Sequence, residues 1–384
     1  MMLSPELTFL LGVVVFWFAL YVLSRVVRLD RHGLEVKPFY FMYRSKALNK
    51  TLDNWAKKRR KLWLVLSNIS IAFGVGLLVF SIYSLLNNLL RFIFPIGAAS
   101  PIVPVIPVLT IRLYWLPYFF FAVGIVILTH ELAHGIIARL ENIPVLSTGI
   151  LAFLVFFGAF VEPDEKKFEK ASVLARLRML SAGSSINLVT ALFVFLLMSG
   201  LFAPPAGLLI SEVVPNGPVD EIGLQQWDVI MAINGTQISS YSDFLNYMED
   251  VKPNQTLTLT VMHANVVEDR TITTMASDNS SRGAVGVPSG SLYNYQPNRL
   301  GLDQYTGVNL FWTLFWIYLL GLSLAVINML PAYPLDGERL LYYPLKTLIK
   351  KRKRELRGVL SAFSWGLLFA NIVLTFWMWG LLSI

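Results

Sequence analysis

The feature that most constrains this 384-residue chain is a series of apolar segments, each long enough to cross a lipid bilayer. A transmembrane helix needs roughly 20 consecutive apolar residues, and the bilayer core admits only helices and closed barrels. Hydrophobic residues make up 55% of the chain and charged residues only 15%. We therefore expect an α-helical multispanning membrane protein with about six transmembrane helices. The predicted spans cover residues 7–27, 62–86, 113–139, 181–202, 308–330 and 359–382.

The third apolar segment ends in the sequence Thr129-His130-Glu131-Leu132-Ala133-His134. Two histidines four residues apart project from one face of a helix and can bind one metal ion. Glu131 lies beside them and can act as a base toward a water molecule that the metal activates. The alternative is that the two histidines merely end an apolar helix. Ionisable residues inside a membrane-length segment nevertheless indicate function.

The fifth apolar segment ends in Asn328-Met329-Leu330-Pro331-Ala332-Tyr333-Pro334-Leu335-Asp336-Gly337. Its prolines break the helix, and irregular backbone at membrane depth requires a cavity or a protein partner. Asp336 could belong to a simple turn at the membrane surface, but a metal ligand explains an acidic residue at this point. The chain contains no cysteine, so zinc ligands must be His, Asp or Glu. We predict one Zn²⁺ ion held by His130, His134 and Asp336. Glu131 is the predicted base, and Asn328 is a candidate donor to the oxyanion.

The chain has a net charge of +8, and the positions of its basic residues indicate how it is oriented in the membrane. Basic residues cluster beside apolar segments, in the block Lys57–Lys61 and between Lys346 and Arg354. The positive-inside rule places both clusters in the cytoplasm. A nucleic-acid patch is the other interpretation of such a block, but we expect no nucleic-acid partner. We expect a multi-pass protein of the cell membrane, with both termini outside and the metal site near the cytoplasmic side.

The segment 149–161 is strongly apolar but too short to span, and both its flanks are predicted to be cytoplasmic. A re-entrant β-hairpin fits this pattern where protein or an aqueous cavity satisfies its backbone. An interfacial helix is the alternative.

In the fourth span, Asn187 needs a polar partner, and either packing or a role at the site would provide one.

Residues 204–303 differ from the rest of the chain because they are polar and acidic. Strands are predicted at 208–214, 229–233, 256–262 and 270–274, with short helices before Gly223 and at 242–248. Sequons at Asn234, Asn254 and Asn279 fit an external face. The predicted division of the chain is 1–62 (anchor and basic loop), 63–203 (membrane core), 204–303 (external domain) and 304–384 (C-terminal membrane core).

The external segment resembles a PDZ domain. The resemblance rests on Gly217-Pro218, Gly223-Leu224, Asp228-Val229-Ile230 and Ile233-Asn234-Gly235. It implies an inserted α+β domain that can bind a peptide end by strand addition. The strand that begins at Gly207 resembles the edge that accepts such peptides.

The two metal-site motifs and the PDZ insertion between them together resemble the site-2 intramembrane metalloproteases. That resemblance implies a zinc protease that cleaves transmembrane helices of other membrane proteins, usually after a first protease has trimmed them. The stretch 158–163 is similar to the strand region thought to hold substrate in that family. Two positions depart from the family pattern: Gly183-Ser184 stands where Gly-Pro is frequent, and Glu338 where a second glycine is frequent. The competing functions are a non-catalytic membrane scaffold that presents a PDZ module, and a transporter.

Overall fold

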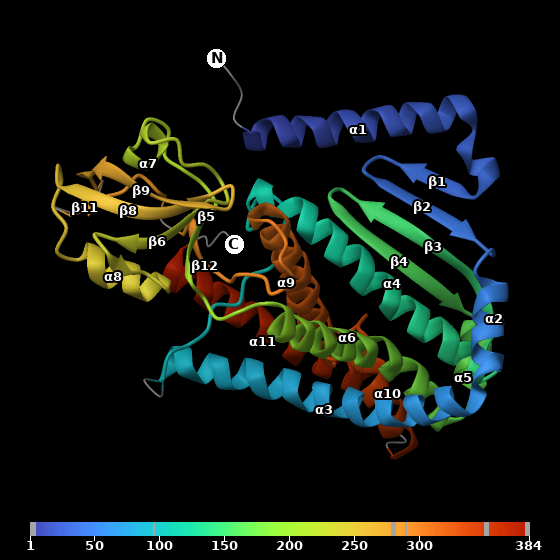
Figure 1. Cartoon of the computed structure of the whole chain (residues 1–384). Coiled ribbons are helices and arrows are strands. Elements are labelled where there is room, and N and C mark those ends of the chain that lie inside the picture. The colour runs from blue at the N-terminus through green and yellow to red at the C-terminus, as the bar shows by residue number, and fades with distance from the viewer. Residues whose placement is uncertain (1–4, 95–96, 278–281, 289, 349–352, 381–384) are drawn as a thin grey trace. The chain divides into compact units, whose positions relative to one another are not determined.

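The computed structural model describes residues 5–94, 97–277, 282–288, 290–348 and 353–380 (Figure 1). The chain divides into two compact units. The first comprises Met1–Phe193 and Trp316–Ile384, and the second comprises Val194–Phe315. Asn279 and residues 349–352 of the basic cluster between Lys346 and Arg354 lie outside the described residues.

Within the described residues, six helices are long and apolar enough to cross a membrane, which confirms the predicted fold class. These helices are α1 (Pro5–Val27), α3 (Arg60–Ile93), α4 (Leu116–Leu140), α6 (Val173–Leu201), α9 (Gln304–Ile327) and α11 (Lys353–Trp379). Several of these helices extend beyond the predicted apolar segments. Helix α6, for example, starts at Val173 rather than near residue 181. Its first turns carry Arg176 and Arg178, so the helix continues past the apolar stretch that the sequence marked.

A four-stranded sheet lies in the first unit. Its strands are β1 (Leu34–Lys37), β2 (Tyr40–Ser45), β3 (Val145–Phe153) and β4 (Phe156–Pro163), in that order, and all neighbours are antiparallel. The pair β3–β4 confirms the predicted hairpin and excludes the interfacial helix. The sequence does not predict strands β1 and β2, because they are short and the strand they join, β3, lies about a hundred residues later in the chain. Helix α4 packs along β4 (Figure 1).

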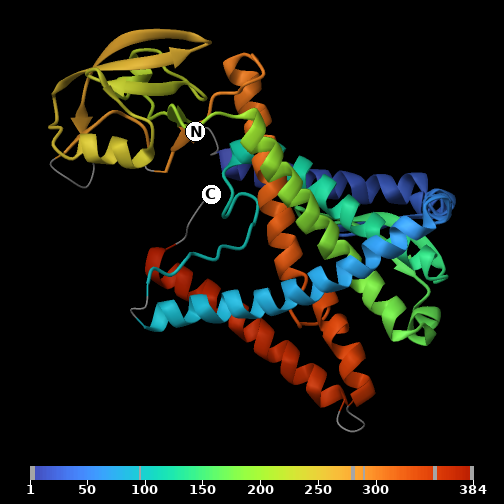
Figure 2. The same ribbon diagram turned by 60° about the horizontal axis from the view of Figure 1, so that its bottom comes forward.

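Shorter elements connect these parts of the first unit: η1 (Leu29–His32), α2 (Asn49–Lys58), η2 (Leu113–Trp115), α5 (Glu165–Lys170) and α10 (Asp336–Leu348). Helices α3 and α11 cross and contact each other (Figure 2), and Asn88 of α3 donates to Asn371 Oδ1 of α11 across 3.0 Å at this crossing. The apolar core joins α2, α3, α4, α6, the end of α9 and α10, and it includes the fully buried Leu52, Ala138, Ala325 and Met329.

The second unit contains a PDZ-like α+β domain. Its sheet has the order β12-β5-β6-β8-β9, and β7 (Thr236–Gln237) also pairs with β6. The strands are β5 (Gly207–Ile210), β6 (Val229–Ile233), β8 (Thr256–His263), β9 (Val266–Thr273) and β12 (Leu292–Tyr295). Helices α7 (Pro218–Glu221) and α8 (Tyr241–Met248) complete the fold, and β10 (Met275–Ala276) pairs with β11 (Gly283–Ala284). Helix α8 begins with a capping box in which Ser240 and Asp243 bond each other's backbone N–H groups.

The expectation that the strand from Gly207 is an open peptide-accepting edge is wrong. Strand β5 is paired on both sides, with β6 and with β12. Strand β12 lies beyond residue 274, where the last predicted strand of the domain ends. Its four residues pair from Leu292 with Ile210 to Tyr295 with Gly207, so β12 and β9 form the edges of this sheet.

Candidate metal centre and active site

Helix α4 carries two of the three predicted metal ligands. His130 and His134 are one helical turn apart, so their rings face the same side, with their Nε2 atoms 3.0 Å from each other. His134 is buried and His130 is partly exposed. Helix α4 continues to Leu140 beyond both histidines, so regular helical backbone holds both imidazoles in place.

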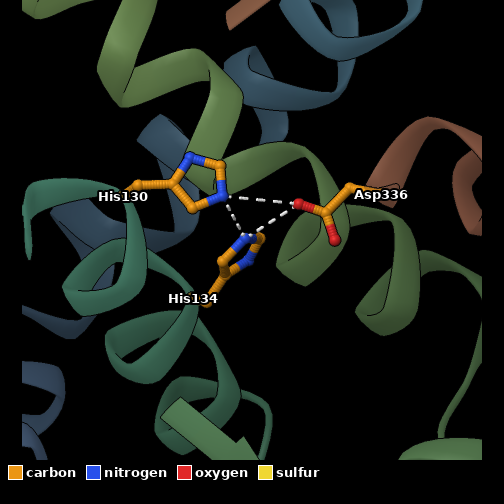
Figure 3. Close-up of side chains that lie close together, drawn as sticks. All are labelled: His130, His134 and Asp336. Atoms are coloured by element: carbon orange, nitrogen blue, oxygen red, sulfur yellow. Dashed lines mark hydrogen bonds and ion pairs between the residues drawn. The ribbon is translucent and has the colours of Figure 1, made fainter. Parts of the chain in front are cut away.

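Asp336 reaches the histidines from a segment about two hundred residues later in the chain (Figure 3). Its Oδ2 atom lies 3.0 Å from His134 Nε2 and 3.5 Å from His130 Nε2. Asp336 is the first residue of α10, where the chain turns after the end of α9. The backbone N–H of Gly337 donates to Asn328 O across 2.9 Å, and a Cβ at residue 337 would lie 2.6 Å from Leu330 O. The turn therefore requires a glycine directly after the aspartate.

The three side chains fit a metal ion. One ligand atom from each of His130, His134 and Asp336 lies within 4.8 Å of the other two. Two imidazole nitrogens and one carboxylate oxygen match the donor set of a catalytic zinc site, which keeps a fourth position open. Gly183 of α6 faces the same space, since a Cβ there would lie 2.5 Å from His130 Nε2 and also against His134 Nε2. A side chain at residue 183 would thus occupy the space between the ligands.

Two further contacts orient the imidazoles. His134 Nδ1 lies 2.7 Å from the backbone oxygen of Met179, to which it can only donate. That bond leaves His134 Nε2 as the free acceptor nitrogen. His130 Nδ1 lies 3.1 Å from the side-chain amide of Asn187, which is buried. The Asn187 Oδ1 atom has no hydrogen-bond partner among the described residues. Rotating the amide by 180° turns this oxygen toward His130 Nδ1–H and frees His130 Nε2 for a metal.

The side chain of the predicted base, Glu131 of α4, extends toward the β3–β4 hairpin. The backbone N–H of Val161 on β4 donates to Glu131 Oε2 across 2.9 Å. This bond fixes one carboxylate oxygen and leaves Oε1 free of that contact.

Asn328 lies in direct contact with the metal-site residues. Its Nδ2 atom donates to Asp336 Oδ2 across 2.8 Å and lies 3.2 Å from His130 Nε2. In this arrangement the amide holds the Asp336 carboxylate beside the histidines.

Glu338, one of the two departures from the family pattern, is a buried carboxylate with a partner. Arg357 of α11 donates two hydrogen bonds to it, at 2.5 and 2.7 Å. Removing either partner would leave an uncompensated buried charge, so Glu338 and Arg357 depend on each other where α10 meets α11.

The structure thus brings together His130, His134 and Asp336, with Asn328 and Glu131 adjacent to them. Sequence reasoning did not identify Gly183, Met179 or Val161 as neighbours of the site. Nor did it find the partner of Asn187, although it noted that this residue needed one. The sequence offered two signals, the run of small residues from Ala182 to Ser185 and the resemblance of 158–163 to a substrate-holding strand, but neither shows which residue faces the site.

Comparisons with known proteins agree with this geometry. Residues 118–371 match the model of peptidase family M50. The uncharacterized protein MJ0971 of Methanocaldococcus jannaschii is 30% identical over 352 residues, covering 90% of this chain and 87% of that protein. The probable protease eep of Enterococcus faecalis is 24% identical, over 56% of this chain and 61% of that protein. Zinc metalloprotease RasP of Bacillus licheniformis is 30% identical, over 35% of this chain and 32% of that protein.

Among solved structures, matches include PDZ domains of SdrC-like proteins from Listeria monocytogenes and Listeria innocua. Their identities are 23% and 24% and their TM-scores 0.20 and 0.21. They cover 21% and 23% of this chain, and 85% and 99% of those domains. The family match covers both metal-site motifs and the domain between them. The chain belongs to peptidase family M50, the site-2 protease family of intramembrane zinc metalloproteases.

Proposed function

We propose that His130, His134 and Asp336 hold the zinc ion, and that Glu131 accepts a proton during hydrolysis of a peptide bond. The bond would lie within or near a transmembrane helix of a membrane protein substrate. The convergence of Asp336 on the two histidines carries this proposal, with Asp336 Oδ2 3.0 Å from His134 Nε2. No packing requirement explains three ionisable side chains gathered between apolar helices.

The roles follow from the contacts of each side chain. A bound zinc ion polarises a carbonyl and lowers the pKa of a water molecule. Glu131 keeps Oε2 on the Val161 N–H, so Oε1 is the atom that would take the proton from water and give it to the leaving amine nitrogen when the C–N bond breaks. Asn328 uses one amide hydrogen to hold Asp336. Its other hydrogen is a candidate donor to the oxyanion that forms at the scissile carbonyl.

Two variants test these roles. Glu131→Gln should keep the wild-type zinc content and lose cleavage of a transmembrane substrate, because only the base is removed. Asp336→Ala should lose zinc as well, since it removes a ligand. A Glu131→Gln protein that cleaves at the wild-type rate would show that the assigned mechanism is wrong.

The orientation in the membrane is also part of the proposal. The basic block Lys57–Lys61 favours a cytoplasmic position for the corner between α2 and α3. Both termini and the PDZ-like domain then lie outside, and the metal site lies near the cytoplasmic side. Because the chain has no cysteine, single cysteines at Asn54 and Thr256 can be labelled selectively. A membrane-impermeant reagent added outside intact cells should label only Thr256→Cys, and the opposite pattern would reverse the orientation.

The earlier cleavage of the substrate and the role of the PDZ-like domain are also part of this proposal. The substrate would first be trimmed by another protease, and the PDZ-like domain would either bind the new peptide end or exclude untrimmed proteins. The four-part division at residues 62, 203 and 303 also stays a prediction.

A further inference from the structure

Five consecutive cations form the corner between α2 and α3. They are Lys57, Lys58, Arg59, Arg60 and Lys61, and all five are exposed. Helix α2 ends at Lys58 and α3 begins at Arg60. We propose that this basic corner binds the headgroups of anionic lipids, and that the bound lipid restrains the C-terminal end of α4.

The basic corner lacks acidic partners among the described residues. The nearby Asp53 pairs with Arg139 at 3.3 Å, and Glu141 pairs with Arg178 at 2.7 Å. Helix α3 has no acidic residue in its first turn. The C-terminal end of α2 and the N-terminal end of α3 meet here and their dipoles offset each other, so the charge of the corner is that of its five cations, and an external anion would relieve their repulsion.

The surroundings of the basic corner favour a lipid over a soluble anion. The apolar side chains that follow on α3 are exposed, including Leu62 (44%) and Val65 (56%). Trp55 of α2 is 45% exposed, and its backbone oxygen accepts a hydrogen bond from Trp63 Nε1 across 2.8 Å. Tryptophan is enriched where the membrane meets water, and basic clusters beside a span attract anionic headgroups. The corner therefore presents cations next to apolar and indole surface, which matches an anionic phospholipid.

The same corner is attached to the helix that carries the histidines. Arg60 donates to the backbone oxygen of Leu140, the last residue of α4, across 3.1 Å. Leu52 of α2 is fully buried and lies against Gly135, the residue after His134. Asn49 of α2 donates to Val145 O at the start of β3, across 3.0 Å. A lipid that restrains α2 and the first turn of α3 thus also restrains the C-terminal end of α4.

Fluorescence transfer in vesicles tests lipid binding without measuring activity. A single cysteine at the exposed Asn54 carries the donor dye. The acceptor is a headgroup-labelled phosphatidylglycerol or, as the reference, a headgroup-labelled phosphatidylcholine analogue. We expect about tenfold enrichment of the anionic lipid near the dye, because each cation attracts such headgroups.

A matched pair of variants locates the binding site. Changing Lys57, Lys58 and Lys61 to Gln removes three of the five cations and should remove most of the enrichment. Changing Lys166, Lys167 and Lys170 of α5 to Gln removes equal charge from another exposed helix and should leave it unchanged. Equal zinc contents would show that both variants are folded. Enrichment that persists undiminished in the first variant, or that both variants lose equally, would overturn the proposal.

Hydrogen exchange tests the link to α4. Amides at 136–140 should exchange more slowly in phosphatidylglycerol vesicles than in phosphatidylcholine vesicles, and the triple variant at Lys57, Lys58 and Lys61 should lose this protection. The same exchange rate in both vesicles would show that lipid does not restrain α4. Protection by inorganic phosphate in phosphatidylcholine vesicles would assign the corner to a soluble anion and contradict a lipid site.

Discussion

Val161 of β4 donates its backbone N–H to Glu131 Oε2 across 2.9 Å. Strand β4 pairs with β3 on one side only, so its other edge faces the residue that we propose as the base. An exposed strand edge can accept an extended peptide through main-chain hydrogen bonds. A substrate that bound along β4 in an extended conformation would therefore pass close to Glu131. The hydrogen bond from Val161 to Glu131 holds the base at a fixed position beside this strand.

Val161→Pro removes this donor and should lower cleavage by roughly 100-fold, a typical contribution of a positioned base. Proline is tolerated on edge strands, so we expect the hairpin to persist. Zinc content should stay unchanged, because no metal ligand is touched. Val161→Ala keeps the N–H and serves as the control, with activity near that of the wild type. Equal rates for the two variants would show that the hydrogen bond does not position Glu131.

Gly183→Ala should abolish zinc binding. The added Cβ would press against the Nε2 atoms of both His130 and His134, in the space between the ligands. Gly200→Ala is the matched control on the same helix, since a Cβ there meets no atom within 4 Å. Metal analysis of the purified proteins should show zinc in the control and none in Gly183→Ala. A full zinc content in Gly183→Ala would mean that the metal lies elsewhere.

Asn187→Ala should weaken zinc binding about 10- to 100-fold, the usual effect of removing a side chain that orients a ligating histidine. Asn187→Asp retains an oxygen that can accept from His130 Nδ1–H and should bind zinc nearly as well as the wild type. Competition with a metal chelator measures both affinities. If the two variants lost the same affinity, Asn187 would act through packing rather than through the His130 ring.

The parts of the site that sequence reasoning found are those that local spacing determines. The separation of His130 and His134 matches one helical turn, and prolines before Asp336 mark the end of a helix. Gly183 depends instead on how α6 is rotated against α4, and nothing in a run of small residues records that rotation. The contact of Val161 with Glu131 likewise depends on how the hairpin docks on α4.

The parts of the fold that sequence reasoning missed depend on non-local pairing. The β3–β4 hairpin was expected because its two strands are adjacent and apolar. Strands β1 and β2 join the same sheet from a segment about a hundred residues earlier, and their local pattern does not indicate a partner that far along the chain. Strand β12 pairs with β5 across most of the PDZ-like domain, so the four residues Leu292–Tyr295 could not be assigned to the sheet by local pattern.

The pairing of β5 on both sides changes what we expect of the PDZ-like domain. A peptide cannot add to β5, because β6 and β12 occupy its two edges. The short β12 edge lies next to α8, where Asn294 Oδ1 accepts from the backbone N–H of Tyr241. A peptide end that bound by strand addition would therefore find less unpaired strand than the sequence indicated. We predict instead that the domain excludes bulky substrates.

Replacing residues 204–296 with a short flexible linker tests this role. The flanking backbone is already joined by hydrogen bonds from Ala203 N to Pro297 O and from Arg299 N to Leu201 O, both 2.8 Å, so a short linker can close the gap. Zinc content and cleavage of a minimal transmembrane substrate should be preserved, because no proposed site residue is removed. Substrates that retain a folded external domain should be cleaved by the deletion variant and not by the wild type. Slower cleavage of trimmed substrates would instead indicate peptide capture, and unchanged rates for both substrate classes would exclude both roles.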